Sequence, residues 1–174
     1  MEWPETLKLD PGAKKAIERA VETNPVPGNW PEGTVYVNAD QAREMAGPLI
    51  EAFHTHLTNA RIAFLFKQHV GGRSQSLAGK ATVTSAKIKH LSDVDFVIEI
   101  NWTMWIGMSV PTRTALLDHE LEHCGVDDKE NWCIISHDIE EFHTIVARHG
   151  LWQQNVKTFA DVCTTQLELL TAPA

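Results

Sequence analysis

Two histidines and two glutamates within five residues form the most chemically specific pattern in this 174-residue chain, His119-Glu120-Leu121-Glu122-His123. His119 and His123 are four residues apart, so on a helix with 3.6 residues per turn both imidazoles project from one face. Two such imidazoles can bind one Zn²⁺ ion, as in the HExxH pattern. Glu120 lies roughly 100° further round the helix, too far to be an equal third ligand but close enough to reach a water molecule at the metal. We therefore expect a zinc site in which Glu120 is the general base.

A catalytic zinc site needs a third protein ligand, which we expect from a segment downstream of this helix. His137 is the leading candidate, because it opens the next predicted helix and a short turn would bring it back toward the first. Glu140 and Glu141 lie about one helical turn further on, and either carboxylate is an alternative ligand, followed by His143 and His149. The four upstream histidines are expected to lie on the surface: His54, His56, His69 and His90.

The predicted metal-binding helix runs from Pro111 to Cys124. Gly125 follows directly, and glycine favours the C-terminal end of a helix. Leu117, Leu121 and Cys124 share the face away from the two histidines, so we expect them to anchor the helix in the core.

An alternating segment from Asp95 to Trp102 precedes this helix and predicts a β-strand. The chain is similar to the minimal zincins, in which this strand forms the edge of the sheet above the metal, and this resemblance implies the same position here. An extended peptide substrate could then add to it as a further strand. The candidate substrate-binding residues are Phe96, Ile98, Ile100 and Trp102.

The remaining chain alternates helical and strand patterns, without an internal repeat or a domain boundary. Further helices are predicted at 11–22, from 38 or 40 to about 57, at 137–149 and at 153–170, and further strands at 34–37, 61–67 and 80–89. A polar turn is expected at 127–131. We therefore predict a single zincin-like α+β domain over residues 1–174. Its small mixed or antiparallel sheet would pack on helices, with the metal-binding helix below an edge strand.

Composition is that of an ordinary soluble globular protein, with 43% hydrophobic and 22% charged residues. A net charge of -8 argues against a broad nucleic-acid-binding face, which needs a basic surface. The N-terminal MEWPETLKLD lacks the apolar stretch of a secretion signal, and no run reaches the ~20 apolar residues of a membrane span. The three cysteines form no CxxC motif and are expected to be reduced. We expect a cytoplasmic protein that acts on a protein or peptide and has no membrane partner; the sequence does not indicate an oligomeric state.

Residues 61–152 resemble the putative phage metallopeptidase family. The resemblance rests on DFVIEINWTMW, RTALLDHELEHCGV and HDIEEFHTIVARHGLW, with RIAFLF and GKATVTSAKIK upstream. It implies peptidase chemistry of the zincin type. More distantly, the chain is similar to the SprT-like minimal zincins, in which a histidine-glutamate helix is followed by a short turn and then by a histidine closely preceding a Phe. Here His137 precedes Phe142 by five residues, one more than in that group, so Glu140 and Glu141 stay open as ligands.

Two other functions stay open beside the peptidase. One is a catalytically silent binding module, in which zinc braces two helices and the protein binds a partner, as in a host-directed or anti-defence role of a phage protein. Closed coordination by four protein ligands would favour it. The other is an SprT-like protease that acts on nucleic-acid-associated proteins, which would require a basic surface or an added binding module.

Overall fold

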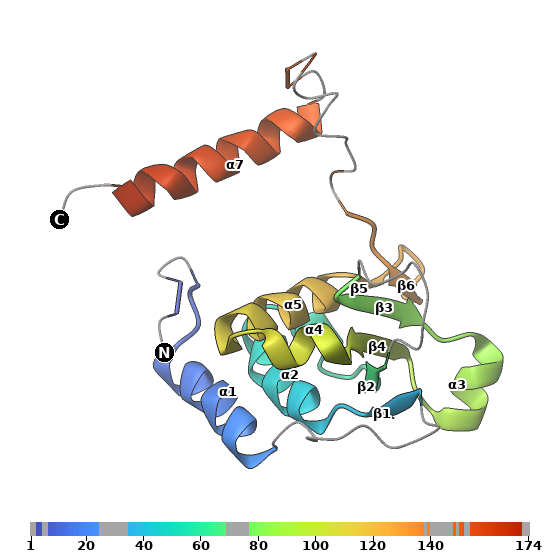
Figure 1. Cartoon of the computed structure of the whole chain (residues 1–174). Coiled ribbons are helices and arrows are strands. Elements are labelled where there is room, and N and C mark those ends of the chain that lie inside the picture. Colours follow the sequence, from blue (N-terminus) through green and yellow to red (C-terminus); the bar gives the residue numbers. More distant parts are fainter. Residues whose placement is uncertain are drawn as a thin grey trace. The chain divides into compact units, whose positions relative to one another are not determined.

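The computed structural model describes residues 3, 4, 7–24, 35–68, 77–137, 139, 148, 150, 151 and 154–171 (Figure 1). The chain forms two compact units, Met1–Ile135 and Ser136–Ala174. In the second unit, helix α7 (Gln154–Thr171) confirms the helix predicted over 153–170, whereas most of the predicted helix 137–149 lies outside the described residues. Two successive units can belong to one folding domain or to two, so the single domain stays a prediction. None of the described helices is long and apolar enough to cross a membrane.

A four-stranded mixed sheet forms the centre of the first unit, in the order β1-β2-β4-β3. Its strands are β1 (Tyr36–Asn38), β2 (Ile62–Lys67), β3 (Gly79–Val83) and β4 (Phe96–Asn101). β2 and β4 run parallel, and β1 and β3 pair antiparallel on their outer sides. The register places Ile98 of β4 opposite Phe64 of β2 and Ala81 of β3. β4 is therefore an inner strand, and β3 is an edge strand.

The helices of the first unit are α1 (Pro11–Thr23), α2 (Asp40–Ala52), η1 (Thr55–Leu57), α3 (Ala86–Ser92), α4 (Trp102–Gly107) and α5 (Val110–Glu122). α2 and α5 lie against the sheet, whereas α3 has no buried residue and joins β3 to β4. α2 packs on β2 and on α5, α1 packs on α2, and α5 contacts β3 (Figure 1). The core between these layers includes fully buried side chains from sheet and helices: Phe66, Phe96, Ile98, Ile100, Met45, Leu49, Leu117 and Leu121. The predicted α+β class, with a small mixed sheet packed on helices, is confirmed.

A short hairpin follows α5 and lies against β3. Its strands β5 (Cys124–Val126) and β6 (Trp132–Ile134) pair antiparallel. The Asp127 carboxylate accepts the backbone N–H groups of Lys129 and Asn131 at 2.8 Å each, which closes the turn. The predicted polar turn at 127–131 is therefore confirmed, but the sequence pattern did not reveal the two strands that it joins.

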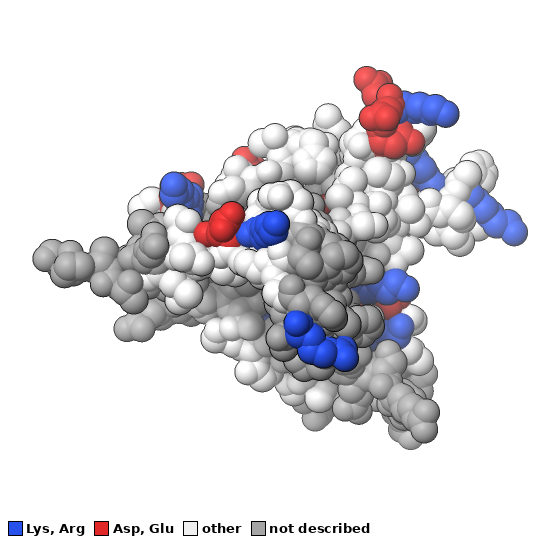
Figure 2. Space-filling view, turned by 90° about the horizontal axis from the view of Figure 1, so that it is seen from above, with Lys and Arg blue, Asp and Glu red and all other residues white. Residues whose placement is uncertain are grey.

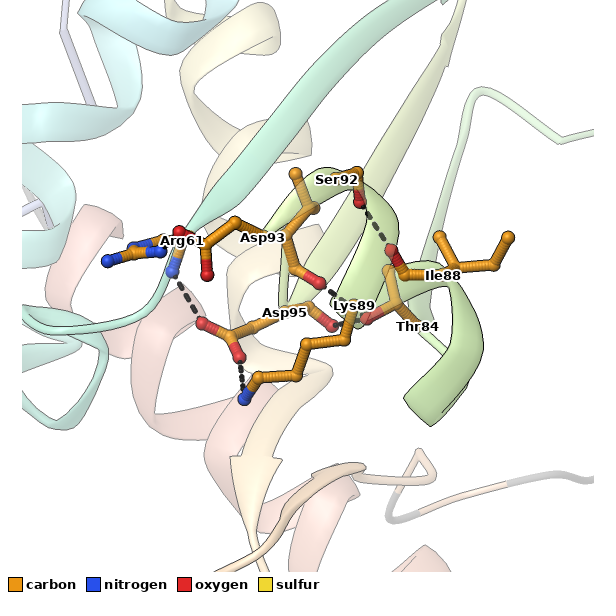
Figure 3. Close-up of polar contacts among 8 residues, drawn as sticks. Arg61, Thr84, Ile88, Lys89, Ser92, Asp93 and Asp95 are labelled. Carbon is orange, nitrogen blue, oxygen red and sulfur yellow. Dashed lines mark hydrogen bonds and ion pairs between the residues drawn. The ribbon is translucent and has the colours of Figure 1, made fainter.

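The strand predicted over 80–89 is wrong in its second half, which forms helix α3. Ser85 starts this helix by accepting the backbone N–H of Ile88, and Asp93 ends it in a left-handed conformation with φ of 56°. Asp95 then holds α3 on the sheet: it forms an ion pair with Lys89 at 2.5 Å and accepts the backbone N–H of Arg61 at 2.9 Å (Figure 3). The cap at Ser85 therefore separates the strand, which keeps the β-prone Thr82 and Val83, from a helix that the alternating pattern did not predict.

The predicted helix 111–124 is found as α5, but it ends at Glu122 and Gly125 does not terminate it. Gly125 lies within β5, where a Cβ atom would come within 2.6 Å of Ile135 Cδ1. Glycine at this position therefore leaves space for the side chain of Ile135, which follows β6. The helix predicted from 38 or 40 to about 57 is found as α2. Its N-cap is Ala39, and it ends earlier than predicted, at Ala52.

Candidate metal site and catalytic glutamate

The orientation of α5 is determined at its start and along its back face. The Ser109 side chain accepts the backbone N–H of Thr112 and caps the first turn. Leu117 and Leu121 are completely buried in the core, as predicted. With this face turned inward, His119 projects to an exposed position while Glu120 is buried. The helix therefore presents an exposed imidazole and a buried carboxylate at two consecutive positions.

The two histidines of α5 lie against each other at its C-terminal end. Their ring centroids are 4.9 Å apart, with an interplanar angle of 86°. His123 Nδ1 lies 2.7 Å from the backbone carbonyl oxygen of Ile135, so Nδ1 carries the proton and donates it. This hydrogen bond leaves the other ring nitrogen, Nε2, able to bind a metal, as is usual for histidine ligands.

His137 follows β6 in the segment that is hydrogen-bonded to the C-terminal end of α5. The Ile135 N–H donates to the His123 carbonyl oxygen at 2.8 Å, which completes a two-way link between the two residues. His137 follows Ile135 by two residues, so their Cα atoms can be at most about 7 Å apart. The ligand atoms offered by His119, His123 and His137 all lie within 4.8 Å of one another. The alternative ligands Glu140, Glu141, His143 and His149 lie outside the described residues.

Glu120 points from α5 toward edge strand β3 and is only 3% exposed. Its carboxylate lies where a side chain of Gly79 would otherwise be. Burial raises the pKa of Glu120, while the charge of a protonated His123 and the backbone N–H of Ala81 act in the opposite direction. A buried carboxylate with a raised pKa beside the histidine cluster is suited to accept and release a proton.

Cys124 directly follows His123 but is not part of the cluster. It is fully buried, and burial together with the neighbouring Glu120 raises the pKa of its thiol to about 12. This raised pKa keeps the thiol protonated. Because only the thiolate is a good zinc ligand, Cys124 is not suited to bind the metal. The cluster of described residues therefore contains three imidazoles and no cysteine.

The surface position predicted for His54 is wrong. His54 is 2% exposed, and its Nε2 lies 2.7 Å from the Asp118 carboxylate of α5. Its Nδ1 lies 3.6 Å from the Glu122 carboxylate, one turn further along the same helix. His54, which lies just after α2, thus links the end of α2 to two acidic residues of α5, Asp118 and Glu122.

The strand predicted at 95–102 is found as β4, but the edge position predicted for it is wrong. β4 has a paired strand on both sides, so its backbone cannot accept a further strand. Phe96, Ile98 and Ile100 point into the core and are fully buried, and Trp102 begins α4 with only 8% exposure. The strand next to the metal-binding helix is β3, whose only paired neighbour among the described strands is β4.

Comparison with known proteins gives one match. A family model described as Putative phage metallopeptidase matches residues 34–160, which include the whole sheet, α5 and the three histidines. Searches of curated proteins and of solved structures found no match.

Proposed function

This chain belongs to the putative phage metallopeptidase family, and on that basis we propose that it is a zinc-dependent peptidase. The observation that carries the proposal is the convergence of His119, His123 and His137 on one point, with Glu120 on the adjacent helix position. Metal binding follows from the histidine cluster in general terms, and zinc is the specific metal that we propose.

The donor set suits zinc. Three imidazoles and one open position are typical of catalytic zinc sites. Nitrogen ligands of a tetrahedral zinc lie roughly 3.3 Å apart, given Zn–N distances of about 2.0–2.1 Å. The three ligand atoms are already within 4.8 Å of one another, so small side-chain rotations would bring them to that spacing. The hydrogen bond from His123 to Ile135 O fixes one imidazole in the required tautomer.

The proposed reaction is hydrolysis of a peptide bond. A zinc ion bound here would polarise the scissile carbonyl and make a water molecule more acidic. Glu120 accepts the proton of the attacking water and then delivers it to the leaving amine. Its buried position and raised pKa support both steps, because a weakly basic, solvent-exposed carboxylate would hold the proton too loosely to pass it on.

The proposed substrate is a protein or peptide in extended form. β3 is an edge strand beside α5, so a peptide that lies along it would come next to Glu120. Strand addition reads the main chain more than the side chains, which suits an enzyme that acts on unfolded or flexible segments.

The alternatives find less support. A silent module with closed coordination lacks a fourth ligand among the described residues, since Cys124 is buried and protonated. For a protease of nucleic-acid-associated proteins, the net charge of -8 is unfavourable. The face shown in Figure 2 carries Lys and Arg in separate small groups rather than as one basic surface. All three cysteines are free, which fits the cytoplasm as the proposed compartment.

The test is Glu120→Gln, with Glu122→Gln as the matched control on the same helix. Glu122 has an 80% exposed side chain, so its substitution should leave activity unchanged. We expect Glu120→Gln to keep about one zinc per chain and to lose at least about 100-fold in the hydrolysis of denatured casein, as is typical for removal of a general base. Loss of zinc from Glu120→Gln would make Glu120 a ligand. Zinc binding by a wild-type protein that cleaves no peptide would favour the silent module.

A further inference from the structure

Gly79 of edge strand β3 lies where the side chain of Glu120 needs space. We infer that Gly79 is a positioning residue: by lacking a side chain, it lets the Glu120 carboxylate lie directly against β3, next to the metal-binding histidines. This inference rests on the proposed function in assigning a catalytic consequence, but the geometry itself can be tested without any activity.

A side chain at position 79 would collide with Glu120. A Cβ atom built on Gly79 would lie 2.8 Å from Glu120 Cδ and 2.9 Å from Glu120 Cγ, closer than real Cβ atoms approach other atoms. The backbone does not require glycine here, because among the described glycines only Gly150 has a positive φ. Space for a side chain, rather than backbone conformation, therefore explains the glycine at position 79.

The strand also offers the carboxylate a donor. Thr84 N–H donates to Asp95 O, and the Ala78 carbonyl accepts from Asn101, so even-numbered residues of this segment direct their backbone groups toward β4. In an antiparallel pair, the alternate residues then direct theirs to the outer side. Ala81 is one of these, so its N–H lies on the outer side of β3, where it favours the charged form of Glu120. Gly79 and Ala81 thus form a small cradle for the carboxylate, one by its lack of a side chain and one by its amide.

A methyl group at position 79 should displace only the carboxylate. The atoms it would meet are the flexible end of the Glu120 side chain, while the backbone of α5 is held by Leu117 and Leu121 in the core. The fold and the three histidines should therefore be unaffected. A displacement of about 1 Å of a catalytic group can cost about 100-fold in rate, so Gly79→Ala should reduce kcat with little change in KM.

The experiment compares Gly79→Ala with Gly107→Ala, where an added Cβ meets nothing within 4 Å. Three measurements are made on each full-length variant. They are the zinc content per chain, kcat and KM for the hydrolysis of denatured casein, and the hydrogen exchange of the Ala81 amide by NMR. For Gly79→Ala we expect unchanged zinc content, a kcat lower by about 100-fold, a KM within about threefold and Ala81 exchange faster by about tenfold. Glu120→Ala should accelerate the Ala81 exchange equally, and Gly107→Ala should match the wild type throughout.

Two results would overturn the inference. One is a Gly79→Ala variant in which Ala81 exchange and kcat both match the wild type. The other is loss of zinc or of folding in that variant, since the substitution would then disturb more than the carboxylate. If the wild type cleaves no peptide, the proposed function fails, and the Ala81 exchange in Gly79→Ala and Glu120→Ala alone decides whether Gly79 positions Glu120.

Discussion

The Nδ1 atom of His123 is held by the main-chain carbonyl of Ile135. Many ligand histidines are oriented by a carboxylate, which a single substitution can remove. Here the acceptor is a backbone carbonyl that every residue at position 135 would provide. The same residue also precedes His137 by two positions, so one short segment both orients one histidine of the cluster and contains another.

The third ligand can be identified by comparing His137→Ala with Glu140→Ala and Glu141→Ala. We expect His137→Ala to weaken zinc binding by orders of magnitude, because it removes one of three protein ligands. The two glutamate variants should lose no more than roughly 10–100-fold in zinc affinity, which is the range for residues that contact metal ligands without binding the metal. Competition with a chelator measures all three affinities. Normal zinc binding by His137→Ala and weak binding by one glutamate variant would give a site of two histidines and one glutamate.

Among the elements, α5 depends on its contact with the segment after α2. We expect His54→Ala to lower the free energy of unfolding by about 1–3 kcal/mol, because it leaves the Asp118 carboxylate without its buried partner. His90 is an exposed histidine on α3, so His90→Ala should change stability by no more than about 0.5 kcal/mol. Urea unfolding of both variants checks the difference. Equal effects would mean that the His54–Asp118 contact does not stabilise α5.

The attachment of α3 to the sheet should depend on pH through Asp95. Burial raises the pKa of Asp95, but the ion pair with Lys89 and the Arg61 N–H outweigh it and hold the pKa below its ordinary value of 3.8 (Figure 3). A depressed folded pKa stabilises the fold above the unfolded pKa, and this contribution is lost as pH falls through the folded value. Asp95→Asn should therefore lower stability by about 1–3 kcal/mol at pH 7, and this difference should shrink below pH 3.8.

Asp93 provides the matched control for Asp95. It forms an ion pair with Arg61, but its side chain is 73% exposed, and it adopts the left-handed conformation that asparagine also accepts. Asp93→Asn should therefore change stability by less than about 1 kcal/mol. Denaturant unfolding from pH 2 to pH 7 compares the two variants. A constant difference between Asp95→Asn and wild type over this range would show that the charge of Asp95 does not contribute.

Elements with a strong local pattern could be predicted from the sequence, and those that depend on distant partners could not. β2 and α5 were found because apolar periodicity and helix signals lie within their own residues. The burial of His54 was missed because its partner Asp118 is 64 residues away. The inner place of β4 was missed for the same reason, since strand order is decided by pairing between remote segments. The clearance at Gly79 likewise exists only once β3 lies on α5.

At the scale of the whole molecule, metal binding should stabilise the folded chain. The three histidines converge only when folded, so zinc at 1,000 times its dissociation constant would add about 4 kcal/mol. For a chain of this length, that corresponds to an increase of roughly 8–16 °C in Tm. Differential scanning calorimetry with and without EDTA measures the shift. The His119→Ala/His123→Ala double variant should show none, and a shift of equal size in that variant would place the metal elsewhere.

The insertion of β4 between β2 and β3 has a consequence for how the chain is made. Synthesis proceeds from the N-terminus, so β1, β2 and β3 all leave the ribosome before the strand that joins two of them. Until residue 101 has emerged, β3 has no partner in the sheet and β2 has one open side. Unpaired strand edges of this kind recruit other chains. A nascent chain stalled or truncated before residue 101 should therefore aggregate, whereas one released just after α5 already contains every strand of the central sheet.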